Sequence, residues 1–294
     1  MKILLIGGLG YVGSFLYDFL ISKEYQVDIC DDNRRPNNSN AHVKYPFNYN
    51  NLTSKIINDY DSILWFAGHS SVGVSNSDPI GAIENNTIAL IDLLKKIPSE
   101  KIKFIYASSA SLYTGYVDYA SEMLKVAPNE NPYDISKFAF DYLAAQYHKN
   151  IFGLRMGTIC GYSKNIRKEL VFNKMCLDAH FLKEINVANP KSERSLLFLV
   201  DLVEIINILI NSSKAKPGIY NALSYNTSIG DLSKLIANYF NASIKMHPDS
   251  PTYSFRMNID KIKEIGFIPK LSVDDHLIQF KQDIQKNEKI LSPR

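Results

Sequence analysis

Short apolar runs alternate with longer segments of helical periodicity over the first half of the chain. The runs read KILLIG, QVDICD, SILWFAG, KFIYASS and IFGLRMGT. Helices are predicted between them, at about 13–22, 52–58, 79–96 and 133–148. Strands that are apolar on both faces are typical of a parallel sheet with helices on both sides. The pattern therefore predicts an α/β fold built on a doubly wound parallel sheet.

The alternation becomes less regular after Gly161. Polar segments such as YSKNIRKE and ANPKSER come before an amphipathic stretch from Val200 to Leu209, a strand GIYNAL and a helix near Ile229 to Phe240. This change predicts two closely packed domains. The first comprises residues 1–165, with 196–223 returning to it, and the second is smaller, discontinuous and mixed α/β, with residues 166–195 and 224–294.

Composition and charge exclude several classes of function. The 294 residues are 46% apolar and 21% charged, which is ordinary for a globular protein. The 33 basic and 30 acidic residues are spread evenly, so no nucleic-acid partner is expected. The most apolar stretch, LLFLVDLVEIINILI, contains Asp201 and Glu204 and is shorter than the ~20 residues of a membrane span. Because Met1 leads directly into the first strand without a signal-peptide pattern, we expect a cytoplasmic protein with no membrane partner.

The cysteines do not indicate a metal site or a disulfide framework. Cys30, Cys160 and Cys176 are odd in number and show no C-x-x-C spacing. We expect them to be small buried residues, and no metal is predicted.

The segment GGLGYVG leads directly from the first predicted strand into the first helix. It gives Gly7, Gly10 and Gly13 the pattern G-x-x-G-x-x-G. Glycine at these places allows a turn with positive φ, a close approach of the backbone to a pyrophosphate, and tight packing of the helix on the sheet. The free N–H groups and the positive dipole end of the helix then face the anion. The segment therefore predicts a dinucleotide site in the first domain, which leaves the second domain for the substrate.

An acidic residue follows at the end of the second strand. Asp31 lies 18 residues beyond Gly13, close to the ~20-residue offset at which a carboxylate binds the adenosine ribose. Such a carboxylate repels a 2′-phosphate, so NAD is favoured over NADP. Arg34 and Arg35 follow and are able to neutralise a phosphate, so NADP stays open as the less favoured cofactor. A purely structural β-turn-α unit also stays open.

The segment NPYDISKFA places Tyr133 four residues before Lys137, on the same face of a helix. A free phenol titrates near pH 10 and acts as a base near neutrality only where its anion is stabilised, for example by a nearby ammonium. About two Tyr-x-x-x-Lys/Arg pairs are expected by chance at this composition, so a solvated helix face is the alternative. The pair needs support from other motifs.

That support comes from five segments, GGLGYVGS, FAGHSSVGVS, YASSASLY, YDISK and LRMG. Their order and spacing resemble the extended short-chain dehydrogenase/reductase family, in its nucleotide-sugar epimerase and dehydratase branch. RSLLFLVDLV and GIYNAL extend the resemblance from residue 1 to about residue 275. The resemblance implies NAD as cofactor, a nucleotide-diphosphate sugar as substrate, and a homodimer through the helices that start near Ile80 and Tyr133.

The resemblance also assigns roles to individual residues. It implies catalysis by Tyr133 as base, by Lys137, which also holds the nicotinamide ribose, and by Ser109, whose hydroxyl bonds the reacting sugar oxygen. The implied cofactor-binding residues are Gly7, Gly10, Tyr11, Val12, Gly13, Asp31, Asp32, Asn48, Ala67, Gly68, Asn86, Ser108, Tyr133 and Lys137. The implied substrate-binding residues are Ser109, Ser111, Thr158, Asn173, Arg194 and Arg256.

For some of these residues a structural role is the alternative. Ser108, Ser109 and Ser111 are then only polar residues at a strand end, and Asn86 only holds a helix by hydrogen bonding. For His69 we expect a packing role or a place beside the cofactor. The run Tyr113, Tyr116 and Tyr119 is interpreted either as a substrate-side loop or as a structural cluster.

The implied chemistry is hydride transfer between a sugar carbinol and the cofactor. The 4,6-dehydratases of the branch carry an Asp-Glu pair where this chain has Ala110 and Ser111, so dehydration is not expected. A 4-epimerase of surface polysaccharide biosynthesis is the first expectation, because LRMGTICGYS resembles members from bacterial surface-sugar pathways. An NAD(P)H-dependent dehydrogenase or 4-ketoreductase is the second, and a non-catalytic dinucleotide-sensing protein is the alternative of another class. Two departures from the galactose epimerases leave the identity of the substrate open. Those enzymes carry an asparagine where this chain has Thr158, and an arginine where it reads MHPDSPT near His247.

Overall fold

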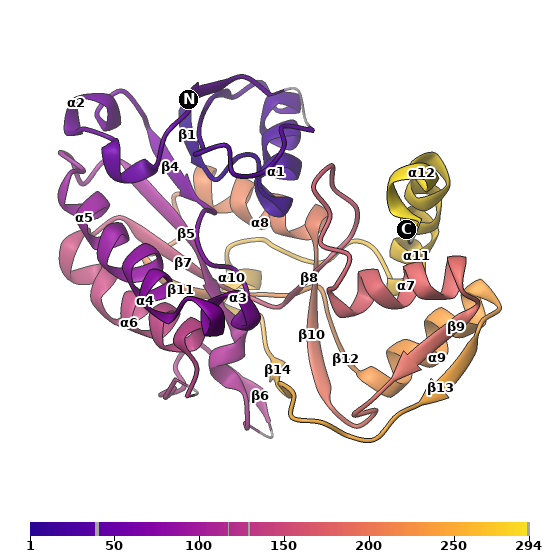
Figure 1. The fold of residues 1–294 in the computed structure, drawn as a ribbon. Coiled ribbons are helices and arrows are strands. Elements are labelled where there is room, and N and C mark those ends of the chain that lie inside the picture. Colours follow the sequence, from indigo (N-terminus) through magenta and orange to yellow (C-terminus); the bar gives the residue numbers. More distant parts are fainter. Residues whose placement is uncertain (39–40, 117, 129, 293–294) are drawn as a thin grey trace.

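The computed structural model describes residues 1–38, 41–116, 118–128 and 130–292. Its larger part is built on a seven-stranded sheet with the order β11-β7-β5-β4-β1-β2-β3, in which all neighbours run parallel (Figure 1). The strands are β1 (Lys2–Ile6), β2 (Gln26–Cys30), β3 (Val43–Tyr45), β4 (Ser62–Trp65), β5 (Lys103–Ser109), β7 (Ile151–Met156) and β11 (Gly218–Ala222). The predicted doubly wound parallel sheet is confirmed. Five of the seven strands are apolar runs from the first half of the chain, β11 is the strand GIYNAL, and β3 was not predicted.

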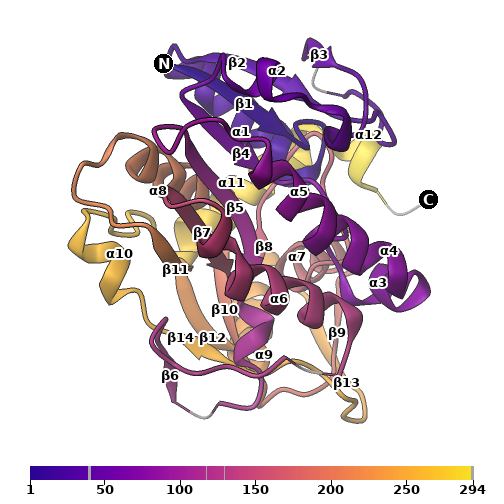
Figure 2. The same cartoon turned by 90° about the vertical axis from the view of Figure 1, so that its left-hand side faces the viewer.

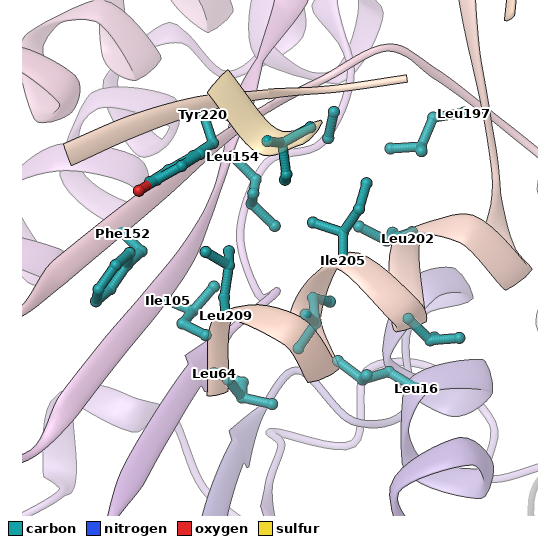
Figure 3. Packing of buried hydrophobic residues seen from close by; sticks show 14 of the residues in the cluster. Leu16, Leu64, Ile105, Phe152, Leu154, Leu197, Leu202, Ile205, Leu209 and Tyr220 are labelled. Carbon is teal, nitrogen blue, oxygen red and sulfur yellow. The ribbon is translucent and has the colours of Figure 1, made fainter. Parts of the chain in front are cut away.

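Helices cover both faces of this sheet. On one face, α1 (Tyr11–Ser22) and α8 (Leu199–Asn211) pack against it, and Figure 3 shows Leu16, Leu202 and Ile205 facing Leu64 and Ile105 of the strands. On the other face lie α4 (Pro79–Ile83), the π-helix η2 (Glu84–Ile88), α5 (Ala89–Lys95) and α6 (Pro132–Tyr147), as Figure 2 shows. Full burial of each such aliphatic side chain contributes roughly 1.5–3 kcal/mol to stability.

The smaller part lies beside this sheet (Figure 1). A three-stranded sheet has the order β12-β10-β8, and a pair joins β13 to β9. Its elements are β8 (Thr158–Cys160), α7 (Val171–Phe181), β9 (Glu184–Val187), β10 (Glu193–Phe198), β12 (Tyr225–Ser228), α9 (Ile229–Phe240), β13 (Ser243–Met246), α11 (Val273–Lys286) and α12 (Glu288–Leu291). Helices α7, α9 and α11 share one apolar core with these strands.

Short elements connect the two parts. The pair β6 (Tyr119–Ala120) and β14 (Arg256–Met257) brings the C-terminal segment to the larger part. The remaining elements are η1 (Tyr49–Asn51), α2 (Ser54–Ile57), α3 (Val72–Ser77), η3 (Ala110–Tyr113) and α10 (Asp260–Glu264). The stretch 196–223 was predicted to return to the first domain. Within it, β11 is a strand of the large sheet and α8 packs on that sheet, whereas β10 pairs with β8 and β12 of the smaller part. The assignment of the two parts to cofactor and substrate stays a prediction, and residues 293–294 of its second domain lie outside the described residues.

The helix predicted at about 79–96 is three successive elements. Asp78 caps α4, the wider π turn of η2 follows, and α5 continues to Lys95. A π turn inserts one residue into the helical ladder and is frequent at functional sites. Asn85, which lies in this π turn, forms part of the wall of the main cleft.

Within the described ranges, no helix combines the length and the apolar character that crossing a membrane requires. The three cysteines are buried free thiols, and no cluster of metal-ligating side chains occurs in the described part of the chain.

Candidate active site

A cleft of about 790 Å³ lies at the carboxyl ends of the central strands. β1 is the point where the strand order reverses, with β2 on one side and β4 on the other, and open α/β sheets bind ligands in the crevice outside such a point. The glycine turn after β1 forms one end of the wall, and Tyr133 and Lys137 form the other. The smaller part contributes residues such as Arg194 and Tyr253.

The chain between β1 and the first turn of α1 has no space for a side chain at Gly7 or Gly13. Gly7 has φ +86°, and a Cβ there would lie 2.6 Å from the Ala67 nitrogen. A Cβ on Gly13 would lie 2.0 Å from the Gly7 carbonyl oxygen. Gly10 is the N-cap of α1 and faces the cleft. The turn thus brings bare backbone and a helix N-terminus to the cleft wall, which is an arrangement that suits an anionic group.

Asp31 at the end of β2 borders the same end of the cleft. It accepts hydrogen bonds from the backbone N–H groups of Leu9 (2.9 Å) and Asn33 (3.0 Å). Burial raises the pKa of Asp31, and these two hydrogen bonds oppose that rise. The neighbouring Asp32 pairs with Arg34 at 2.8 Å, so one of the two arginines that could receive a 2′-phosphate already has an acidic partner.

Ser109, Tyr133 and Lys137 meet at the other end of the cleft. Ser109 ends β5, and Tyr133 and Lys137 lie on successive turns of α6. Lys137 Nζ donates to the Ala107 carbonyl oxygen at 2.9 Å and lies 4.7 Å from the centroid of the Trp65 ring. It lies 5.8 Å from the centroid of the Tyr133 ring.

The ionisation of both groups is shifted by burial. Burial lowers the pKa of Lys137 to about 7, and the negative charge of Asp141 opposes this shift. Burial raises the pKa of Tyr133 and the charge of Asp134 adds to the rise, whereas the Ser109 hydroxyl and the charge of Arg167 oppose it. Phenol and amine are therefore both held closer to their neutral forms.

A buried ion pair anchors α6 to the strands. Arg155 Nε on β7 donates to Asp141 Oδ2 at 3.0 Å, and the Tyr106 hydroxyl on β5 donates to Asp141 Oδ1 at 2.9 Å. Asp141 lies one turn beyond Lys137 on the same helix. Loss of one partner from such a pair leaves an uncompensated charge, so the network fixes α6 on the sheet.

Most of the predicted site residues share this cleft. Its wall includes Gly7, Gly10, Tyr11, Val12, Asp31, Asp32, Asn48, Ala67, Gly68, Ser108, Ser109, Ser111, Tyr133, Lys137, Thr158 and Arg194. Arg194 is buried, its pKa is lowered to about 10 by burial, and it donates to Thr252 Oγ1 at 2.6 Å. Whether these residues bind cofactor or substrate stays a prediction.

Among the described residues, four that were predicted for the site do not line the cleft. Gly13 packs against Gly7, and Asn86 donates to the His69 carbonyl oxygen and to Ser136 Oγ, both at 3.0 Å. Asn173 accepts from the Gly161 N–H and donates to the Tyr11 hydroxyl and the Arg167 carbonyl oxygen. Arg256 lies over the Tyr119 ring at 4.8 Å. A substrate contact of Asn173 or Arg256 stays a prediction.

Several wall residues were not predicted from the sequence. They include Tyr49, Ser70, Ser71, Asn85, Arg167, Leu170, Tyr253 and Phe255. Arg167 donates to the Ser70 carbonyl oxygen at 3.0 Å, which joins positions 97 residues apart. Ser70 and Ser71 belong to the segment FAGHSSVGVS, whereas Arg167, Leu170, Tyr253 and Phe255 lie outside the segments that carry the resemblance. His69 does line the cleft, and its Nε2 lies 3.2 Å from Asp78 Oδ2, a partner that the sequence did not suggest.

The tyrosine run lies outside the described wall of the cleft. Tyr113 is buried and bonds Arg155 and Asn221. Tyr116 donates to the Lys125 carbonyl oxygen, and Tyr119 is exposed. For Tyr113, the structural alternative fits these contacts.

Comparison with known proteins identifies the class that this fold and site define. The family described as the NAD dependent epimerase/dehydratase family matches residues 3–222. The chain belongs to this family, which confirms the predicted resemblance, and the cofactor of the family is NAD.

Among curated proteins, the chain is similar to UDP-glucose 4-epimerases. It is 30% identical to that of Halalkalibacterium halodurans over 149 residues, 48% of this chain and 44% of the relative. The match to the Streptococcus mutans enzyme is also 30%, over 48% of this chain and 45% of the relative. The matched region thus spans less than half the length of these relatives. UDP-glucuronic acid decarboxylase 2 of Arabidopsis thaliana is 23% identical, over 97% of this chain and 68% of the relative.

Solved structures share the fold over nearly the whole chain. UDP-glucuronic acid 4-epimerase from Bacillus cereus, in complex with UDP-glucuronic acid and NAD, has a TM-score of 0.84 at 23% identity and covers 97% of this chain and 99% of its own. UDP-glucose 4-epimerase from Thermus thermophilus, in complex with NAD, has a TM-score of 0.80 at 19% identity, with the same coverage. At these identities the likeness establishes the fold alone.

Proposed function

We propose that this protein is an NAD-dependent nucleotide-sugar 4-epimerase. The observation that carries the proposal is one cleft with a glycine turn and Asp31 at one end and Ser109, Tyr133 and Lys137 at the other. The family and the similarity to UDP-glucose 4-epimerases support it.

The wall of the cleft fits a dinucleotide. A Cβ at Gly7 or Gly13 would fill the space that the backbone turn needs, and the N-terminus of α1 is free to meet a pyrophosphate. Asp31 at the end of β2 is placed to bind ribose hydroxyls. Bound NAD would supply the hydride acceptor. We assign the binding of its nicotinamide ribose to Lys137.

Tyr133 exchanges the proton of the sugar hydroxyl in this proposal. Burial holds the phenol protonated, so the anion forms only when positive charge lies beside it. Lys137 supplies such charge, and its ammonium form is favoured once an anion is near. Ser109 bonds the reacting oxygen. Asn86 fixes the helix next to the site, because its amide bridges the His69 carbonyl oxygen and Ser136.

We assign the diphosphate of the substrate to Arg194. Its guanidinium is buried in the wall on the side of the smaller part, and it bonds Thr252 and the Glu193 carbonyl oxygen. Thr158 and Ser111 complete the sugar side. The resemblance of residues 154–163 to members from bacterial surface-sugar pathways supports a role in polysaccharide biosynthesis.

Dehydration is not proposed. Position 110 is an alanine and position 111 a serine, where the dehydratases carry an acidic pair. A net NAD(P)H-dependent dehydrogenase or 4-ketoreductase is the second candidate. Thr158, where galactose epimerases carry asparagine, leaves the sugar open.

The test is a panel of UDP-, GDP- and dTDP-sugars with product analysis by NMR. We expect one 4-epimer pair to interconvert without accumulation of NADH. Denatured protein should release about one NAD per chain, since an epimerase regenerates its cofactor in place. Stoichiometric NADH formation would favour the dehydrogenase, and no turnover of any sugar would contradict both candidates.

A further inference from the structure

Trp65, the single tryptophan of the chain, contacts the amine of Lys137. Lys137 Nζ lies over the face of the indole, 4.7 Å from the ring centroid. Lys137 belongs to the wall of the cleft, whereas Trp65 is fully buried and is not among the residues that form the described wall. Trp65 therefore acts on a ligand only through its neighbours, of which Lys137 is one.

The indole is fixed in place by its surroundings. Trp65 is the last residue of β4, where it pairs in register with Tyr106 of β5. The Tyr49 ring meets the indole edge to face, with centroids 6.1 Å apart and an interplanar angle of 82°. A Cβ on Gly68 would lie 2.8 Å from Cη2 of the indole. The ring face that meets Lys137 is thus a fixed part of the site.

The face of an aromatic ring attracts an ammonium more than it attracts a neutral amine. It carries partial negative charge, and the attraction is greatest for tryptophan and for cations that are withdrawn from water. Lys137 meets both conditions, since its side chain lies over an indole and the residue is 5% exposed. Burial lowers the pKa of Lys137, and the charge of Asp141 opposes this fall. The indole face acts in the same direction as Asp141.

An aromatic face stabilises the ammonium without cancelling its charge. A carboxylate in the same place would form an ion pair, and its negative charge would disfavour an anion at Tyr133, whose ring centroid is 5.8 Å from Lys137 Nζ. Asp141, one turn further along α6, pairs instead with Arg155 at 3.0 Å and accepts from the Tyr106 hydroxyl. The positive charge of Lys137 therefore stays available to Tyr133.

The ring also leaves a hydrogen-bond donor of Lys137 for the cleft. An ammonium has three N–H groups, and one of them bonds the Ala107 carbonyl oxygen at 2.9 Å. Even with a second N–H directed at the ring, one donor remains for a ligand. Lys103, by contrast, donates to two carbonyl oxygens in the last turn of α8. The amine of Lys137 is thus held by one carbonyl oxygen and one ring face.

We propose that Trp65 is a positioning residue: its indole face holds Lys137 as an ammonium in the wall of the cleft, so that a positive charge is available to Tyr133 and a donor to the ligand. This inference deepens the proposed function and rests on it for the roles of Lys137 toward Tyr133 and the nicotinamide ribose. The attraction between indole and ammonium is present without any ligand, so it is measured separately.

NMR titration of isotope-labelled lysine side chains in the nucleotide-free protein measures this attraction. Because Trp65 is the single tryptophan, tryptophan that carries increasing numbers of fluorine atoms changes this ring and no other side chain. Fluorine withdraws electrons from the ring face. We expect the pKa of Lys137 to fall with each added fluorine, and by about 1 in total once the face has lost its negative charge. The resonance of Lys137 is assigned by its loss in Lys137→Met.

Fluorination separates this role from simple packing. It changes the size of the ring little, so the burial of Lys137 is kept and the protein is expected to fold. Lys103 and Lys261 lie over other rings, 5.2 and 4.2 Å from the centroids, and are internal controls whose titrations should not change. The proposal is overturned if the pKa of Lys137 stays constant or rises as the ring is fluorinated.

The pH dependence of turnover tests the consequence for the reaction. Lys137 loses its proton at lower pH when the ring attracts it less, so the basic limb of the pH–rate profile should move to lower pH by the same amount. A basic limb that stays in place while the pKa of Lys137 falls would contradict a positioning role. If no nucleotide sugar is turned over, the proposed function fails, and the NMR titration still decides whether the indole holds the ammonium.

Discussion

At the scale of single residues, burial favours the neutral forms of the Tyr133 phenol and the Lys137 amine. Lys137 is 5% exposed and contacts a carbonyl oxygen and an indole ring. Desolvation of the ammonium accounts for its pKa of about 7. Strong shifts of this kind cluster at functional sites, although structural networks produce them too.

Tyr133→Phe tests the role of the phenol. We expect a fall in turnover by about 10²- to 10⁴-fold, the usual contribution of a general acid–base group, with NAD still bound. Turnover of a nucleotide sugar and NAD released on denaturation are the two measurements. Tyr147→Phe, on the same helix but partly exposed, is the control. Wild-type turnover in Tyr133→Phe would refute the assignment of the base.

Lys137→Met tests how much the buried amine of Lys137 lowers the free energy of unfolding. Removing it should raise the free energy of unfolding of the nucleotide-free protein by roughly 1–3 kcal/mol below pH 7, while turnover is lost. The pKa of Lys137 is about 7 when folded and 10.5 in the reference state, so between these values only the unfolded chain binds the proton. Stability of the wild type therefore rises with pH across this window, and its difference from Lys137→Met shrinks. Urea unfolding at pH 6 and pH 9 measures this, and a constant difference would contradict it.

At the scale of elements, residues 161–167 form a segment that crosses from the smaller part to the glycine turn. Ser163 Oγ donates to the Tyr11 carbonyl oxygen at 2.7 Å, and Asn165 Nδ2 donates to the carbonyl oxygens of Leu9 (2.6 Å) and Pro36 (3.1 Å). Arg167 at its end bonds the Ser70 carbonyl oxygen. The segment thus ties together three loops around the predicted cofactor end of the cleft.

Asn165→Ala should loosen this segment. The variant loses these two hydrogen bonds and the one that Asn165 Oδ1 accepts from Asn38 Nδ2 at 2.7 Å. Because each is worth about 1 kcal/mol, the dissociation rate of NAD is expected to rise by about 10-fold or more. Exchange of bound NAD for labelled NAD measures the rate. Asn287→Ala removes the side-chain bond to the Asp283 carbonyl oxygen, in the C-terminal helices, and serves as control. Equal rates in the two variants would show that the segment does not retain the cofactor.

At the scale of the whole molecule, α4 and α6 lie on the face that Figure 2 turns toward the viewer. These two helices and η2 expose large apolar side chains. Ile80 and Tyr142 are each 71% exposed, and Ile88 is 52% exposed. A surface of this kind is often an interface. The homodimer expected from the family resemblance would cover it.

Ile80→Asp should therefore shift the protein from dimer to monomer in analytical ultracentrifugation. A charge in a buried interface remains unpaired, so we expect the dimer to weaken by at least about 10-fold. Ile290→Asp changes an exposed isoleucine on α12 and is the control. A wild-type protein that sediments as a monomer would contradict the predicted dimer.

The sequence by itself determined the parts of this protein that depend on local spacing. Apolar runs predicted six strands of the large sheet, because a strand buried on both faces has no polar side. The glycine pattern predicted the turn after β1, and the four-residue step placed Tyr133 and Lys137 on one face of a helix, since a turn and a helix convert fixed spacing into fixed local geometry. The packing of the sheet then brings both groups to one cleft.

Only the tertiary structure decided the remainder of the site. Asn173 satisfies backbone and tyrosine groups in the interior, Arg256 lies over Tyr119, and Arg167 reaches the cleft from a segment without a motif. The Ser111 hydroxyl likewise bonds Asp134, which lies 23 residues further along the chain. Such contacts depend on how distant elements pack against each other, and local spacing carries no record of that packing.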